Sequence, residues 1–193
     1  MAAAGGGSFS SRLIKRLVKE ISALSEESQA VGIKIHVPNM EDGSSLVHTP
    51  WKAIMKGPPD TPYEGCVYEI NVTIPAEYPH QPPTMMFVNQ CWHPNIGVNG
   101  HVCIDILKRE WSPTLSVLKI LLSVQSMLDD PDPTSPLNGE AATMFVNARA
   151  GRSWEAYKRT VRKSAQIRYS LSPQLANFDP DQKVLLTGPD AWK

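Results

Sequence analysis

The segment CVYEINVTI, residues 66–74, decides the fold of this chain. Apolar residues occupy every second position in its second half, which is the period of a β-strand whose successive side chains point to opposite faces. One face of the strand therefore collects Tyr68, Ile70, Val72 and Ile74. We predict that this face meets the core of the domain.

Two further strands are predicted beside this segment, around Trp51 to Met55 and around Met85 to Val88. Residues that favour turns separate the three strands, because glycine, proline and aspartate readily take up the backbone angles of tight turns. These turn segments are Gly57-Pro58-Pro59-Asp60 and the run from Pro79 to Pro83. The pattern is typical of an antiparallel meander.

An amphipathic helix is predicted before the strands, starting near Ser10 or Ser11. Its apolar residues fall at helical spacing, at Leu13, Leu17, Ile21 and Leu24. Four basic residues crowd the rest of its surface: Arg12, Lys15, Arg16 and Lys19. Charge alone favours a solvated surface for this basic face over a docking site.

Three helices are predicted after the strands. The first carries an apolar stripe and ends at Asp130-Pro131-Asp132-Pro133, and its stripe is Leu115, Leu118, Leu121, Leu122, Gln125 and Leu128. Asn138 is a suitable N-cap for the second, and the third has Trp154, Tyr157 and Val161 at helical spacing. Strands followed by helices indicate an α+β fold.

The 193 residues suit one domain with two tails. We expect a flexible segment over 1–9, a core domain over 10–170 and a C-terminal tail over 171–193. Lysine plus arginine balance aspartate plus glutamate at 19 each, so no overall charge attracts nucleic acid or an anionic membrane. The odd number of cysteines, three, favours a reducing compartment, the cytoplasm or the nucleus. No apolar run is long enough to span a membrane, and no signal peptide is evident.

Five separated motifs occur in order along the chain. They are Tyr78-Pro79-His80-Gln81-Pro82-Pro83, His93-Pro94-Asn95, the segment GHVCIDIL over 100–107, Trp111-Ser112-Pro113 and Asp130-Pro131-Asp132-Pro133. Any one of them is weak, but together they are specific. From Leu13 to Ser170 the chain resembles the ubiquitin-conjugating enzyme family. The resemblance implies the UBC-type fold: an N-terminal helix, a four-stranded antiparallel meander, active-site loops, a central helix and two C-terminal helices.

The resemblance implies that Cys103 receives ubiquitin from an activating enzyme as a thioester and passes it to a lysine of a substrate protein. The incoming thioester is already activated, so an ordinary thiol needs little help from a neighbouring base. Cys66 and Cys91 are interpreted as small buried apolar residues. The chain itself needs no cofactor, because the activating enzyme uses the ATP.

Asn95 is the polar group that the family places near the thioester. Its amide either donates to the oxyanion of the tetrahedral intermediate or holds a neighbouring loop. Asparagine also favours turns, and a turn role after Pro94 is compatible with both. His93, Pro94 and Trp111 are expected to order the site rather than to titrate.

The family often places a lysine-activating carboxylate in the loop after the central helix, where this chain has Ser135. A serine supplies no charge, so Asp132 and Asp105 are the nearest acidic candidates. Asp105 also argues against the NEDD8 branch, which tends to carry asparagine there. The segment between Cys103 and Trp111 lacks the extra residues typical of the SUMO branch, so ubiquitin is the favoured cargo.

Docking surfaces follow from the same resemblance. The first helix, with Arg12, Lys15, Arg16 and Lys19, is expected to meet an acidic domain of the activating enzyme. The loops around His80 and around Ser112-Pro113-Thr114 are expected to meet the ligase. His80 replaces an aromatic anchor, which favours RING or U-box ligases over the HECT type, although it also suits a plain surface turn. A monomer is expected.

Four other interpretations compete with this one. Cys91-x-His93 and His101-x-Cys103 could hold zinc, but one-residue gaps are unusual for zinc ligands and we expect no metal. A cysteine hydrolase with His93 or His101 as base lacks a recognisable nucleophile motif. A non-catalytic scaffold of the same fold would be expected to lack Cys103, and another ubiquitin-like modifier, NEDD8 or SUMO, could replace ubiquitin.

Overall fold

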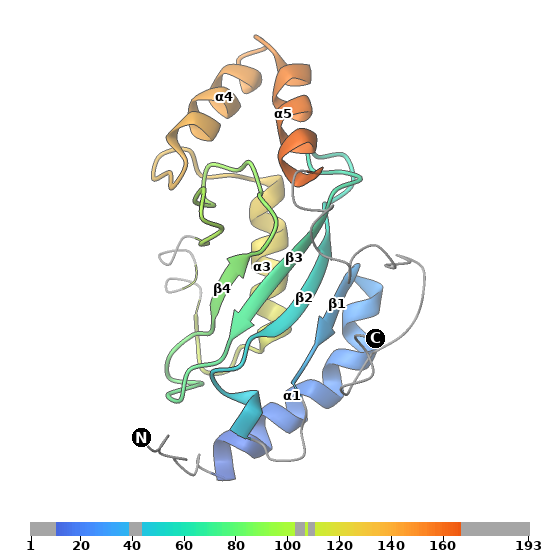
Figure 1. Ribbon diagram of the computed structural model, residues 1–193, viewed down its shortest axis with the longest axis vertical. Coiled ribbons are helices and arrows are strands. Elements are labelled where there is room, and N and C mark those ends of the chain that lie inside the picture. The colour runs from blue at the N-terminus through green and yellow to red at the C-terminus, as the bar shows by residue number, and fades with distance from the viewer. Residues whose placement is uncertain (1–10, 39–43, 103–106, 108–110, 167–193) are drawn as a thin grey trace, which may run out of the picture.

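The structure, a computed structural model, describes residues 11–38, 44–102, 107 and 111–166. The predicted segments 1–9 and 171–193 lie outside the described residues. An N-terminal helix precedes a four-stranded antiparallel sheet, and helices follow it, so the predicted α+β fold is confirmed (Figure 1). No helix in the described ranges is both long enough and apolar enough to cross a membrane.

The sheet is a meander in the order β1-β2-β3-β4, and every neighbouring pair is antiparallel. Its strands are β1 (Ile33–His36), β2 (Trp51–Lys56), β3 (Val67–Thr73) and β4 (Thr84–Phe87). Tyr68, Ile70 and Val72 of β3 are fully buried, and so is Ile74 just beyond its end. The prediction from residues 66–74 is therefore confirmed, whereas the residues of β1 had not been located from the pattern.

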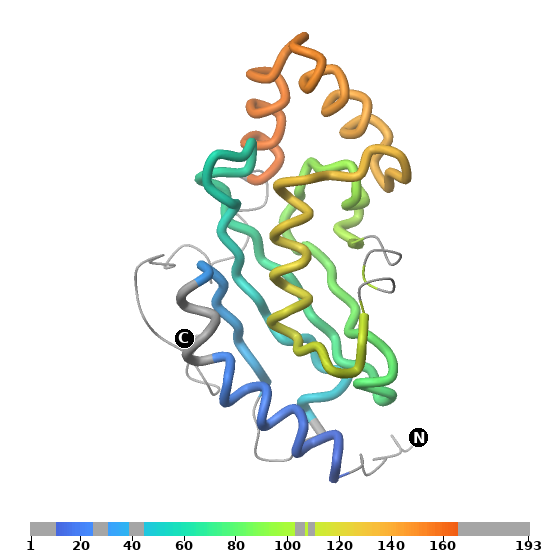
Figure 2. Tube along the Cα trace, turned by 180° about the vertical axis from the view of Figure 1, so that it is seen from behind, coloured from blue at the N-terminus to red at the C-terminus, as the bar shows by residue number. Residues whose placement is uncertain are grey.

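Helix α3 (Val117–Asp129) covers one face of the sheet, behind the strands in Figure 1 and in front of them in Figure 2. Ser116 is its N-cap, and the Ser116 hydroxyl accepts a hydrogen bond from the Lys119 amide at 3.3 Å. The predicted stripe needs a correction, because Leu115 precedes the helix and Leu122 is only half-buried. The buried residues of the helix are Val117, Leu118, Ile120, Leu121, Val124, Met127 and Leu128.

Helix α1 (Ser11–Ala30) packs against β1 and α3. Leu13, Leu17, Ile21 and Leu24 are all buried, as their spacing predicts. A short 3-10 helix, η1 (Ser44–Leu46), precedes β2.

Helices α4 (Gly139–Arg149) and α5 (Trp154–Gln166) form the end of the molecule beyond the sheet, at the top of Figure 1. Asn138 is the N-cap of α4, as predicted, and its side chain accepts from the Ala141 amide at 3.1 Å. The hydroxyls of Tyr157 on α5 and Tyr63 in the β2–β3 connection lie 2.8 Å apart. This contact joins the helical end to the sheet.

Candidate functional site

The segment before Cys103 forms a compact loop against β4. Ile96 and Val102 pair as an antiparallel bridge, and the Val102 amide donates to the Met85 carbonyl at 3.4 Å. Cys103 and Asp105 lie outside the described residues. The residue directly before Cys103 in the sequence, Val102, therefore pairs with Ile96, the residue directly after Asn95.

Gly100 is required for this loop. Its φ is +87°, and a Cβ at this position would stand 2.1 Å from the Phe87 carbonyl oxygen. The Phe87 amide donates to the Gly100 carbonyl at 2.8 Å, so the loop is held close to β4. Any other residue would have to push these two backbones apart.

His93 is completely buried, and both of its ring nitrogens have backbone partners. Nδ1 accepts from the Asn95 amide at 2.9 Å, so Nε2 must carry the proton and donate to the Met127 carbonyl at 2.9 Å. Burial lowers the pKa of His93 to about 4. The neutral ring therefore ties its own loop to the end of α3, and neither nitrogen is left for a metal or for base catalysis.

Acid should weaken the fold through His93. Its pKa is about 4 in the folded chain and about 6.5 in an unfolded chain, so only the unfolded chain takes up a proton as pH falls between these values. Complete passage through this window should lower the free energy of unfolding by about 3 kcal/mol. Urea denaturation of wild type and of His93→Gln between pH 7 and pH 4 measures it. The variant should be less stable at pH 7 but should lack this part of the pH dependence, and equal slopes would contradict the assignment.

Asn95 is buried, and its side chain holds the loop that follows α3. Nδ2 donates to the Asp132 carbonyl at 2.7 Å and, at 3.5 Å, to the Ser135 carbonyl, while Oδ1 accepts from the Asp132 amide at 2.8 Å. The carbonyl of Pro94 accepts from the amides of Leu137 and Asn138 at 2.8 and 3.0 Å. Hydrogen bonds from the triplet His93-Pro94-Asn95 thus hold the segment 127–138 at several points, from the end of α3 to the start of α4.

The two described candidates for assisting the lysine lie in that same loop. Ser135 is exposed and meets Asn95 only through its backbone carbonyl. One carboxylate oxygen of Asp132 accepts from the amide and the hydroxyl of Thr134, which turns the loop locally. The loop therefore brings Ser135 and the Asp132 carboxylate to the neighbourhood of Asn95.

The other two cysteines differ from a reactive thiol. Cys66 and Cys91 are 7% and 3% exposed, and burial raises the pKa of both thiols, strongly so for Cys91. Cys91 is enclosed, and both ring nitrogens of His93 already have hydrogen-bond partners. Neither side chain is therefore suited to bind zinc.

The predicted ligase loops lie side by side. The Trp111 indole donates to the Pro79 carbonyl at 2.9 Å, and its ring packs at 5.6 Å from the ring of Tyr78. His80 is exposed beyond Pro79, while Pro113 and Thr114 are exposed and Ser112 is half-exposed beyond Trp111. Trp111 thus connects two segments about thirty residues apart in sequence.

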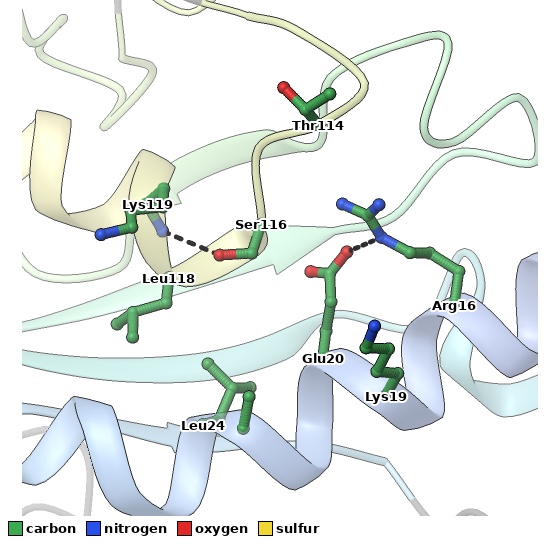
Figure 3. A pocket seen from close by; sticks show the side chains of 9 residues that line it. Arg16, Lys19, Glu20, Leu24, Thr114, Ser116, Leu118 and Lys119 are labelled. Atoms are coloured by element: carbon green, nitrogen blue, oxygen red, sulfur yellow. Dashed lines mark hydrogen bonds and ion pairs between the residues drawn. The ribbon is translucent and has the colours of Figure 1, made fainter.

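The basic face of α1 is smaller than its sequence indicates. Arg12, Lys15 and Lys19 are exposed. Arg16 instead bonds Glu20 and donates to the Leu115 carbonyl at 2.7 Å, beside a pocket between α1 and the start of α3 (Figure 3). Glu20 is a residue of this cluster that the motifs do not include, although its position four residues after Arg16 is a signal for an ion pair on one helix face.

Comparisons with known proteins agree with this geometry. The family model for ubiquitin-conjugating enzymes matches residues 16–165. The E2 domain of a Toxoplasma gondii ubiquitin conjugating enzyme is 36% identical, covers 79% of this chain and 95% of its own, and superposes with a TM-score of 0.63. A Plasmodium yoelii protein provisionally assigned as a ubiquitin conjugating enzyme is 35% identical, covers 81% and 95%, and has a TM-score of 0.68. This chain therefore belongs to the ubiquitin-conjugating enzyme family.

Proposed function

We propose that this chain carries ubiquitin as a thioester on Cys103 and transfers it to a lysine. The Cys103 thiolate attacks the carbonyl carbon of ubiquitin bound to the activating enzyme, and the thiolate of that enzyme leaves. The neutral amine of the lysine then attacks the new thioester and expels the Cys103 thiolate, and the amine's remaining extra proton passes to solvent. Ubiquitin ends in an amide bond and Cys103 is free again.

The burial of the other two cysteines is the observation that favours Cys103 as the thioester site. The sequence has three, and two of them are buried with raised thiol pKa values, so at neutral pH they are protonated and shielded from a protein-sized acyl donor. Cys103 follows Val102, which lies opposite the neighbour of Asn95. Because consecutive Cα atoms are about 3.8 Å apart, this covalent link favours a thioester close to the Asn95 loop.

Asn95 serves this reaction as a positioning residue. Its Nδ2 donates to the carbonyls of Asp132 and Ser135, which favours an ordered loop over a direct bond to the oxyanion. The Asp132 carboxylate supplies the negative charge that Ser135 lacks, and such a charge attracts the ammonium form of the lysine.

The cargo and partners follow the family. Ubiquitin, a ubiquitin-activating enzyme, a RING or U-box ligase and substrate proteins are the proposed partners, in the cytoplasm or the nucleus. ATP is consumed by the activating enzyme and not by this chain.

Parallel charging reactions with the ubiquitin, SUMO and NEDD8 systems test this proposal. With its own activating enzyme and ATP, ubiquitin should give a species heavier by one ubiquitin that thiol reductant removes. A charged species only with SUMO or NEDD8 would change the cargo, and none with any system would favour a scaffold.

Charge reversal on α1 should slow charging. Changing Arg12, Lys15 and Lys19 to glutamate is expected to lower the charging rate by about tenfold at low salt, because these exposed cations steer an acidic partner, and the effect should shrink as salt rises. Initial rates at several salt concentrations measure it. Reversing Arg159, Arg162 and Lys163, three exposed cations on α5, is the matched control, and equal slowing by both sets would refute a surface specific to α1.

A further inference from the structure

Glu20 is a buried carboxylate that joins three parts of the molecule. It lies on α1, is 7% exposed, and uses both of its oxygens. Oε1 accepts from Arg16 on the same helix and from the Tyr78 hydroxyl at 2.6 Å. Oε2 accepts from the amide of Val117, the first residue of α3, at 2.9 Å.

Each of these contacts leads to one of the ligase loops. Tyr78 directly precedes Pro79 and His80, and its ring packs on Trp111. Val117 directly follows residues 112–116, and Arg16 holds the same segment at the Leu115 carbonyl. The two loops are therefore fastened to each other by Trp111 and to α1 by Glu20 with Arg16.

We propose that Glu20 is a positioning residue. It lies on α1, the helix whose exposed cations are proposed to meet the activating enzyme, and from there it fixes the positions of the two ligase loops. This inference rests on the proposed function, since it assigns the loops around His80 and Ser112 to the ligase. Glu20 touches neither partner nor the reacting atoms. It acts by fixing the shape that the ligase recognises.

The charge of Glu20 suits this role. A carboxylate can accept from all three donors at once, and its negative charge lies at the positive end of α3. Burial, then the bond to Glu20, raises the pKa of Tyr78, so its hydroxyl remains a donor throughout the physiological range. Glutamine has nearly the same shape, but its NH₂ group cannot accept, so at least one donor would lose its partner.

Kinetic measurements distinguish a positioning role of Glu20 from a general loss of stability. Glu20→Gln should raise the KM for the ligase by about tenfold in ligase-stimulated discharge, which is the size of one lost charge-assisted hydrogen bond. Charging, discharge to free lysine and kcat at saturating ligase should stay within about twofold. The matched control is Glu69→Gln, another buried carboxylate, which lies on β3 and pairs with Lys52 of the neighbouring strand β2. It should leave the KM for the ligase unchanged.

Tyr78→Phe gives an independent check, because it removes one donor and leaves Glu20 charged. It should raise the KM for the ligase by less than Glu20→Gln does, and the double variant should resemble Glu20→Gln. An unchanged KM in Glu20→Gln, or equal losses in ligase-dependent and ligase-free discharge, would overturn the inference.

Amide hydrogen exchange keeps the test independent of the proposed function. Glu20→Gln should speed exchange within residues 78–81 and 112–117, whereas Glu69→Gln should not. If wild type fails to charge, the proposed function fails and the role in the ligase falls with it. Unchanged exchange in Glu20→Gln while wild type charges would sink the Glu20 inference alone.

Discussion

Replacing Cys103 with serine should turn the labile ubiquitin adduct into one that survives thiol reductant. The hydroxyl can accept the acyl group, but an alkoxide is a poorer leaving group than a thiolate, so the oxyester is more stable. Transfer to lysine should fall by at least about 10³-fold, in the range seen when a nucleophile is lost. Gel analysis with and without reductant, followed by single-turnover discharge to lysine, measures both effects.

Two control variants accompany this experiment. Cys66→Ala and Cys91→Ala remove the buried thiols and should still form the reductant-sensitive adduct. Any loss of stability in these variants should appear in thermal unfolding and not in the chemistry of the adduct. A reductant-sensitive adduct that persists in Cys103→Ser would place the reacting thiol elsewhere.

Asn95→Ala should combine a slower transfer with a looser loop. It deprives the amide and the carbonyl of Asp132 of their side-chain partner, so we expect a loss of about 2 kcal/mol in the free energy of unfolding. Discharge to lysine should slow by about 10²-fold, because a misplacement of about 1 Å in the site can cost that much. Denaturation, single-turnover discharge and hydrogen exchange of residues 130–136 are the measurements.

Two changes at Asp132 separate loop order from charge. Asp132→Asn keeps an oxygen that can accept from Thr134, whereas Asp132→Ala loses it. The proposed charge role predicts slower discharge in both variants, with the larger loss in the alanine variant because it also loosens the loop; an asparagine variant close to wild type would contradict that role and leave loop order alone. A large loss in both would assign the effect to the Asp132 carboxylate. Slower transfer in Asn95→Ala with unchanged exchange would instead indicate a direct bond to the oxyanion.

The elements with strong local periodicity could be predicted from the sequence. Alternation over 66–74 located β3, and the spacing from Leu13 to Leu24 located α1, because burial of one face imposes its period on the residues. Strand β1 is as short as β4, but β4 follows the turn run from Pro79 to Pro83, which marks its start, and no such run precedes β1. The stripe of α3 was misplaced at Leu115 and Leu122, because a sequence rich in leucine conceals which turns contact the sheet.

The site could be predicted as a set of residues but not as a set of contacts. Motifs pointed to His93 and Asn95, but their partners lie 34 and 37 residues along the chain. Such pairs depend on how α3 packs against the sheet, which no local pattern records. The internal role of Arg16 was missed for the same reason, since its contact with Leu115 spans 99 residues.

Protection of cysteines from alkylation tests the central claim most directly. Wild type is charged with ubiquitin, denatured at mildly acidic pH, and alkylated with a maleimide before reductant is added. Peptide mass spectrometry then measures the fraction of each cysteine that carries the maleimide label. The account predicts that Cys103 alone is protected, in proportion to the charged fraction, and that reductant restores its labelling. Protection of Cys66 or Cys91 with Cys103 fully labelled would contradict it.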